Sequence, residues 1–416
     1  MQRQNPIASR AQCLERDAAD PLRNLRERFA LRDGLIYLDG NSLGPLPRAA
    51  MAGFERAIRR EWGEDLILSW NKAGWFDKPS ALGDRLGAWI GAGPGQTVVC
   101  DTTSINVFKA VHAAMALNPS RDVIVAEAGS FPTDLYVVEG VMAAAGRPLT
   151  RRLVDLHAPD ERWLDARLGA ALLNVVDYRT GRMADVAGLT RKIHAAGGLV
   201  IWDLCHSAGV IDFAFDALGV DFAVGCTYKY LNGGPGAPAF IAVAKQHQER
   251  AANPLSGWWG HAAPFEFQRD YVPAQGIRRF LCGTQPILSM RGVEAGLDAV
   301  EGVAIADLRA KSLALTGLFM ARVAALAPQV EILTPWAEAE RGSQVALGFA
   351  RGYAVVQAMI GRGVIGDFRE PGLMRFGFAP AYNGFADVWD AAEILASCLR
   401  DEVWRDERHA RRSAVT

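Results

Sequence analysis

Residues 171–203 read ALLNVVDYRTGRMADVAGLTRKIHAAGGLVIWD, and this stretch carries one complete strand–helix–strand pattern. Its apolar start, residues 171–176, is typical of a buried strand, and Asp185 stands at the N-cap position of a helix that a Gly-Gly pair at 197–198 ends. The next run, residues 199–202, is apolar on both faces, as parallel strands inside a sheet are. The stretch therefore predicts a βαβ unit of a mostly parallel sheet.

The same alternation of short apolar runs and helical patterns continues on both sides of this unit. Upstream, strands are expected at residues 97–100 and 123–127, with a helix between them. Downstream, residues 221–225 and 238–244 are typical of two further strands. The pattern predicts an α/β fold in which a large domain, residues 56–310, holds a mostly parallel sheet flanked by helices.

The last quarter of the chain has a different pattern, that of a smaller α+β unit. We predict a small C-terminal domain over residues 311–416, and we expect the N-terminal segment, residues 1–55, to pack with it. The elements expected in this part are helices at 303–326, 353–360 and 385–402 and strands at 330–333, 345–349 and 373–377.

Composition and charge limit the classes of partner. The chain has 416 residues, with 45 Lys and Arg against 46 Asp and Glu, so its formal net charge is −1. Nucleic-acid and anionic-membrane partners normally require a basic excess, so neither is expected. Only seven of the 45 basic residues are Lys. A Lys whose sequence context suggests a function is therefore one of only seven.

The cysteines and the apolar runs bear on the cellular compartment. Six cysteines are scattered without a CxxC pair, which is typical of reduced thiols in an intracellular protein. The first residues lack the apolar core of a signal peptide, and no uncharged run approaches the roughly 20 apolar residues of a membrane span. We expect a cytoplasmic, soluble protein.

The glycine-rich run from Gly91 to Gly95 resembles a dinucleotide-binding loop only superficially. It follows a helical stretch and precedes a strand, which is the reverse of the dinucleotide-binding order, and Pro94 removes one backbone amide. We therefore interpret this run as a turn.

An acidic residue, Asp203, stands directly at the carboxyl end of a buried strand, where open α/β sheets bind their ligands. The alternative is that Asp203 caps the next turn and that His206 is a hydrogen-bonded core histidine. A Cys-His metal site is disfavoured because no second Cys/His pair lies at ligand spacing. We therefore predict no metal.

Lys229 stands where a buried strand runs into a glycine-rich turn, residues 225–236. A Lys in such a place is costly unless its amine is neutralised, paired or used covalently. The alternative is a surface Lys beside a loop, which the flanking tyrosines and the apolar strand disfavour. A strand-end Asp followed 26 residues later by a strand-end Lys suggests a pyridine nitrogen held by the acid and an aldehyde held by the amine, as in pyridoxal phosphate enzymes.

Such a cofactor needs a phosphate site, and residues 102–104, Thr-Thr-Ser, open a predicted helix. Hydroxyls, free amides and the positive end of the helix dipole would converge there on an anion. An ordinary helix cap has the same sequence, so the motif has weight only together with Asp203 and Lys229.

Taken together, these residues resemble the bacterial kynureninases, fold-type-I pyridoxal-phosphate enzymes of the aspartate-aminotransferase superfamily. The resemblance runs from about residue 30 to the C-terminus and is carried by separate motifs along the chain. The matching segments are residues 38–44 (LDGNSLG), 101–109, 131–136 (FPTDLY), 202–209, 225–236, 255–258, 282–286 (CGTQP), 363–367 and 375–378.

The resemblance implies an aspartate-aminotransferase-like fold, a pyridoxal 5′-phosphate cofactor and a specific set of site residues. Lys229 would bind the cofactor covalently, Asp203 would pair with its pyridine nitrogen, and Tyr228 is the candidate acid. Asn174 departs from the family, because a hydroxyl residue is expected near the ring's phenolic oxygen. The other implied cofactor contacts are Thr103 and Ser104 at the phosphate, together with Tyr228; Phe131 stacked on the ring; and Pro132, Thr133, Asp134, Asn174 and His206 beside it.

The resemblance also implies a homodimer whose active sites are shared between subunits, with Trp258 and Thr284 reaching the neighbouring site. Arg375 would clamp the substrate α-carboxylate, a task that suits its planar fork. Trp70 and Asn41 are the other implied substrate contacts. Trp70 and Thr284 favour unsubstituted kynurenine over its 3-hydroxy form.

The implied reaction is hydrolysis of the Cβ–Cγ bond of L-kynurenine to anthranilate and L-alanine, a step of tryptophan catabolism and NAD biosynthesis. One alternative is a cysteine desulfurase or selenocysteine lyase of the same superfamily. These enzymes need a mobile nucleophilic Cys, whereas we expect Cys282 to be buried. The other alternative is a non-catalytic pyridoxal-phosphate-binding protein, which would not require a carboxylate clamp.

Overall fold

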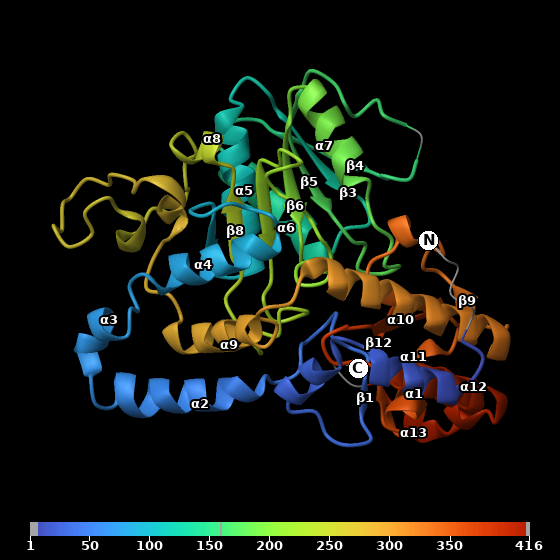
Figure 1. Ribbon diagram of the computed structural model, residues 1–416. Coiled ribbons are helices and arrows are strands. Elements are labelled where there is room, and N and C mark those ends of the chain that lie inside the picture. The colour runs from blue at the N-terminus through green and yellow to red at the C-terminus, as the bar shows by residue number, and fades with distance from the viewer. Residues whose placement is uncertain (1–6, 159, 413–416) are drawn as a thin grey trace. The chain divides into compact units, whose positions relative to one another are not determined.

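The computed structural model describes residues 7–158 and 160–412, which form two compact units (Figure 1). The first unit contains the described residues up to Ala49, the short segment Arg179–Met183 and the chain from Asp298 onward. The second contains Ala50–Tyr178 and Ala184–Leu297. No helix among the described residues is long and apolar enough to cross a membrane.

A seven-stranded sheet forms the centre of the second unit, with strand order β2-β8-β7-β6-β5-β3-β4. The neighbouring strands from β7 to β4 are parallel, and β8 pairs antiparallel with both β7 and β2. The prediction of a mostly parallel sheet is confirmed. The strands are β2 Thr97–Val99, β3 Val123–Glu127, β4 Thr150–Val154, β5 Leu168–Asn174, β6 Leu199–Asp203, β7 Phe222–Gly225 and β8 Phe240–Val243.

The second unit also contains helices, several of which pack against this sheet (Figure 1), and local capping explains where two of them begin. The side chain of Asp185 accepts a hydrogen bond from the Gly188 amide, and that of Thr102 accepts one from the Ile105 amide. The helices are α2 Arg48–Arg56, α3 Ser69–Lys72, α4 Lys78–Trp89, α5 Thr103–Leu117, α6 Pro132–Ala144, α7 Val186–Ala195, α8 Lys245–Gln248 and α9 Ile287–Asp298.

The core of this unit contains the inner residues of the strands, such as Ile124, Leu172 and Ile201, packed against α5. These side chains are fully buried, and each contributes about 1.5–3 kcal/mol relative to exposure. The continuous burial of β3, β6 and β7 is the reason that their sequences lack a polar face.

The first unit contains a four-stranded antiparallel sheet of order β12-β13-β10-β9, and a separate parallel pair, β1-β11. Its core joins α10, α11 and α12 to the inner face of β10 and β13. The strands are β1 Ile36–Tyr37, β9 Glu331–Ile332, β10 Gln344–Gly348, β11 Val364–Ile365, β12 Asp367–Arg369 and β13 Leu373–Gly377; the helices are α1 Arg10–Ala19, α10 Ile305–Leu326, α11 Gly352–Ile360, α12 Phe385–Arg400 and α13 Glu407–Ala410.

Two local expectations from the sequence differ in outcome. The run from Gly91 to Gly95 is a turn between α4 and β2, as predicted. Lys229, however, does not end a strand: β7 ends at Gly225, and Lys229 lies four residues further, in the following turn. Polar residues begin at Thr227, where the chain leaves the sheet, so the strand is shorter than its apolar flanks suggest.

Candidate active site

The carboxyl ends of β5, β6 and β7 meet at one edge of the sheet and bring the central residues together. Asn174 and Asp203 are register partners on β5 and β6, and Asp203 pairs with Val224 of β7. The Asp203 side chain is 5% exposed, and its Oδ1 accepts a hydrogen bond from the Cys205 amide at 2.6 Å. Asp203 thus caps the turn that follows β6 and also stands at the carboxyl edge of the sheet, the edge at which open α/β sheets bind ligands.

Lys229 and His206 are in direct contact. The Nζ atom of Lys229 lies 2.9 Å from Nε2 of His206, and 6.0 Å from the centre of the Tyr228 ring. His206 is buried, whereas Lys229 is partly exposed. Lys229 is therefore not a free surface lysine, and its amine remains within reach of a small molecule at this edge.

A second buried carboxylate, Asp134, lies near Asp203. Burial raises the pKa of Asp134 well above its ordinary value, and the charge of Asp203 raises it further. Burial likewise raises the pKa of Asp203, while the Cys205 amide opposes that shift. Two acids in one buried region are a favourable place for a protonated ring nitrogen, because a cation would offset both charges.

The amide of Asn174 links strand β5 to the loop before α6. Its Nδ2 donates to Ser130 Oγ at 2.7 Å and is 3.5 Å from Asp134 Oδ2. Asn174 thus has a donor at the position where the family leads us to expect a hydroxyl. Ser130 was not singled out from the sequence, because a Ser before a Phe-Pro helix start is indistinguishable from an ordinary loop residue.

The residues predicted for the phosphate and the ring face surround this edge. Thr103 and Ser104 are the first two residues of α5, and Thr103 Oγ1 lies 3.8 Å from Cys205 Sγ. Phe131 is 49% exposed and makes an edge-to-face contact with Tyr178, with ring centres 5.3 Å apart. Pro132 and Thr133 open α6 directly after it. An exposed aromatic ring beside buried acids is available to stack on a planar ligand.

Tyr228 precedes the lysine and is partly buried. Burial raises the pKa of its phenol, and the neighbouring Cys226 raises it further. The phenol is therefore protonated at neutral pH and can donate a hydrogen bond.

The structure places Trp258 in an aromatic cluster with Trp70 and Trp259. Its ring centre is 6.3 Å from that of Trp70 and 5.3 Å from that of Trp259. Trp258 remains 39% exposed and Thr284 is exposed.

Cys282 is only partly buried, so the expectation that it is buried is wrong. The short segment around Gly283 turns at the surface and leaves the thiol incompletely covered.

The first unit holds the predicted carboxylate clamp. Arg375 on β13 is 1% exposed and pairs through Nε and Nη2 with both oxygens of Asp367, its cross-strand partner on β12. Nη2 also donates to Ser42 Oγ at 3.3 Å. Asp367 was not predicted from the sequence as the partner of Arg375. The alternation of side chains along the two strands of a short hairpin could have indicated that these residues face each other.

Two further polar side chains of the first unit, those of Asn41 and Asp39, lie close to Ser42 in the sequence. Asn41 is fully buried and donates from Nδ2 to Gln344 Oε1 at 3.2 Å, while its Oδ1 lies against the backbone of Gly377. Burial and the charge of Asp367 raise the pKa of Asp39 to about 7. No group of three or more His, Cys, Asp or Glu within residues 7–158 and 160–412 could hold a metal ion.

Comparison with known folds agrees with the class predicted from the sequence. The chain is similar to the cysteine desulfurase CsdA of Escherichia coli, with a TM-score of 0.75 and 18% identity, covering 95% of this chain and 99% of that one. It is equally similar to a cysteine desulfurase from Thermococcus onnurineus NA1, with a TM-score of 0.75 and 16% identity over 91% of this chain and 98% of that one. At such low identity the likeness shows the fold alone.

Comparison of sequences is more specific. A family model described as the kynureninase C-terminal domain matches residues 308–395. The chain is 50% identical to a kynureninase of Burkholderia pseudomallei, covering 99% of this chain and all of that protein. It is 48% identical, with the same coverage, to a kynureninase of Pseudomonas fluorescens. This chain belongs to the kynureninase family.

Proposed function

We propose that this protein hydrolyses the Cβ–Cγ bond of L-kynurenine to release anthranilate and L-alanine, with pyridoxal 5′-phosphate as its cofactor. The observation that carries the proposal is the meeting of Lys229, His206 and Asp203 at one sheet edge in a chain that is 50% identical to a kynureninase over its length. The desulfurase alternative is not favoured, because the desulfurases share the fold at only 16–18% identity.

The residues at the sheet edge fit this cofactor. When bound, pyridoxal phosphate supplies an aldehyde that reacts with amines and a protonated pyridine ring that withdraws electrons from the substrate's Cα and Cβ bonds. Asp203, buried and with a raised pKa, would accept a hydrogen bond from the ring nitrogen and keep it protonated. The first turn of α5, with Thr103 and Ser104, would hold the phosphate.

Proton transfer falls to side chains around Lys229. Its amine, 2.9 Å from His206, would take the proton from the substrate's Cα and return it to a neighbouring carbon. Tyr228, whose phenol is protonated at neutral pH, would donate a proton during cleavage. Phe131 would cover the ring face and exclude water from it.

Arg375 would hold the substrate α-carboxylate. Asp367 fixes two of its nitrogens, and Ser42 contacts one of them, so the plane of the guanidinium is set before substrate arrives. Asn41, buried one residue before Ser42, would contact the substrate as well. Trp70, in its aromatic cluster, would pack on the substrate's aromatic ring and favour the unsubstituted ring.

We also propose that the enzyme is a cytoplasmic homodimer in which Trp258 and Thr284 complete the neighbouring site. Large apolar side chains of the second unit support this assembly, because exposed apolar surface is characteristic of interaction sites. Figure 1 shows α2, α3 and the segment after α8 projecting on the same side of that unit. The exposed side chains there include Met51, Trp62, Ile67, Phe265 and Phe267.

The decisive experiment incubates the purified, pyridoxal-phosphate-loaded protein with L-kynurenine. Anthranilate fluorescence should appear together with an equal amount of alanine, and 3-hydroxykynurenine should be cleaved with a lower kcat/KM. L-cysteine serves as the control substrate. Release of sulfide from cysteine without anthranilate from kynurenine would overturn the proposal in favour of a desulfurase, and inactivity toward both would favour a binding protein.

A further inference from the structure

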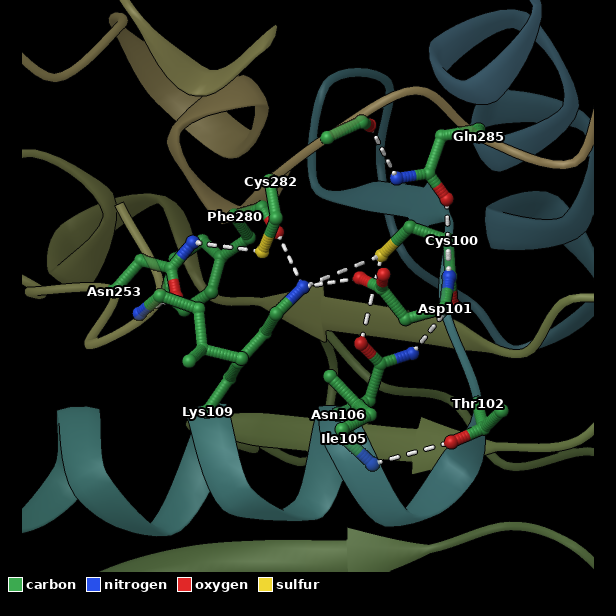
Figure 2. Close-up of polar contacts among 12 residues, drawn as sticks. Cys100, Asp101, Thr102, Ile105, Asn106, Lys109, Asn253, Phe280, Cys282 and Gln285 are labelled. Atoms are coloured by element: carbon green, nitrogen blue, oxygen red, sulfur yellow. Dashed lines mark hydrogen bonds and ion pairs between the residues drawn. The ribbon is translucent and has the colours of Figure 1, made fainter. Parts of the chain in front are cut away.

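Another lysine of the second unit, Lys109, lies at the end of a buried polar network that the proposed reaction does not use. Its side chain projects from α5 and is fully buried. Figure 2 shows its amine between two segments distant in the sequence: the turn of Cys100 and Asp101, and the stretch that begins at Phe280. A buried ammonium is unfavourable unless every donor finds a partner.

The partners of this amine belong to both segments. Lys109 Nζ makes an ion pair with Asp101 Oδ2 and donates to the Phe280 carbonyl oxygen at 2.6 Å. The sulfur of Cys100 lies 3.9 Å from the same nitrogen. Burial alone would lower the pKa of Lys109, but Cys100 and Asp101 raise it above its ordinary value. The amine therefore stays charged and cannot act as a second nucleophile toward an aldehyde.

Asp101 needs this support because its backbone is strained. Its φ is +49°, in the left-handed region that residues other than glycine rarely adopt. Besides the ion pair with Lys109, its amide donates to Gln285 Oε1 at 3.1 Å, and its carbonyl accepts from the Ala239 amide at 2.9 Å. Gln285 in turn donates to the Gly283 carbonyl at 3.1 Å (Figure 2).

The conformation of Asp101 decides where the next residues lie. Thr102 is the cap of α5 and Thr103 and Ser104 are its first residues, so the direction of the amides offered to an anion is set at Asp101. Thr284 stands between Gly283 and Gln285, in the segment tied to the same turn. Lys109 thus joins the stretch that the proposed function assigns to phosphate binding to the stretch that contains Thr284, which it assigns to the neighbouring subunit's site.

We propose that Lys109 is a positioning residue that preorganises the phosphate-binding turn, without touching the cofactor itself. This inference rests on the proposed use of pyridoxal phosphate. It implies that loss of Lys109 weakens binding of the phosphorylated cofactor much more than binding of pyridoxal, which lacks the phosphate. A lysine that only stabilises the core would affect both ligands equally.

The test compares wild type with Lys109→Met, which keeps the length of the side chain and removes the charge. Equilibrium binding of pyridoxal phosphate and of pyridoxal to the apoprotein is followed by the absorbance band of the lysine-bound ligand. We expect the phosphorylated ligand to bind roughly tenfold more weakly and pyridoxal to change less than about twofold. Parallel losses for the two ligands, or no loss for either, would overturn the proposal.

The chain offers a matched control in Lys78, another buried lysine of the same unit, which pairs with Glu294 at 3.1 Å. Lys78→Met should leave the ratio of the two affinities unchanged. A second control, Asp101→Asn with Lys109→Met, removes the carboxylate left unpaired near the phosphate. Full recovery in this double variant would mean that charge repulsion, not positioning, caused the loss.

If Lys109→Met does not fold, Gln285→Met breaks the second link to the same turn. It should also weaken pyridoxal phosphate selectively, and an unchanged affinity ratio would overturn the proposal. Failure of the proposed function is recognised separately, because the wild-type apoprotein would then form no absorbance band with pyridoxal phosphate.

Discussion

Nζ of Lys229 and Nε2 of His206 lie 2.9 Å apart, so two loops that follow neighbouring parallel strands are joined at the amine that we propose binds the cofactor. The histidine lies 23 residues before the lysine in the chain and is buried. It limits the positions that the amine can take, and a nucleophile held in one place reacts faster than a free one.

Replacing His206 should therefore slow attachment of the cofactor to Lys229 without preventing it. We expect His206→Ala to reduce the rate by roughly tenfold, the effect of about 1.4 kcal/mol in the barrier. The measurement is stopped-flow absorbance after pyridoxal phosphate is added to apoprotein. His194→Ala, which removes a histidine that pairs with Asp221 instead, is the control. An unchanged rate in His206→Ala would show that the contact has no role in attachment.

Arg375 should control substrate affinity and not cofactor binding. Arg375→Ala removes the proposed clamp, so KM for L-kynurenine should rise by roughly a hundredfold, while the absorbance band of the bound cofactor stays. Arg375→Lys keeps the charge but loses the planar fork, and its KM should lie between those of wild type and Arg375→Ala. Steady-state kinetics with anthranilate fluorescence give the values. A fall in kcat at unchanged KM would contradict the carboxylate role.

Asp39 should make stability depend on pH. Its pKa in the folded protein is about 7, whereas an unfolded Asp ionises near 4, so between these values the folded state holds the extra proton and stability falls as pH rises. Asp39→Asn removes this effect. In urea unfolding, the free energy of unfolding of the variant should rise relative to that of wild type by on the order of 3 kcal/mol between pH 4.5 and 7.5. A constant difference across this range would show that Asp39 does not titrate there.

The turn after Lys229 lies so close to α9 that it leaves no room for a side chain at Gly296. A Cβ at Gly296 would lie 2.1 Å from the carbonyl oxygen of Leu231, two residues beyond Lys229. Gly296→Ala should displace this turn, lower the free energy of unfolding by about 1–3 kcal/mol and weaken the cofactor band. Gly140→Ala on α6, where a Cβ meets nothing within 4 Å, should raise stability by about 0.5–1 kcal/mol. Similar effects in the two variants would contradict the packing argument.

The sequence predicts well those elements whose own residues determine them. Strand β7 is apolar throughout, and β3 and β6 are apolar up to their terminal acids, because these strands are buried on both faces; α7 has its own capping Asp185. Strand β4, Thr150–Val154, was missed because all but its last residue are exposed or half-buried, because it contains two arginines, and because it owes its conformation to pairing with β3.

Site contacts are harder to predict than site residues. Asp203 and Lys229 stand out by their position after apolar runs, but the partnership of Lys229 with His206 requires β6 and β7 to be neighbours in the sheet. The pairing of Arg375 with Asp367 depends in the same way on the register of β12 and β13. Strand order and register are set by packing over the whole unit, which local patterns do not contain.

The small number of lysines has a practical consequence for chemical labelling. Lys78, Lys109 and Lys311 have side chains at most 10% exposed, each in an ion pair, whereas Lys72, Lys192 and Lys245 face solvent. Among the lysines, an amine-reactive dye or resin therefore meets three outer positions and, at the sheet edge, Lys229. Conjugation with the cofactor in place would spare that last amine, so the enzyme can be immobilised at a few defined points.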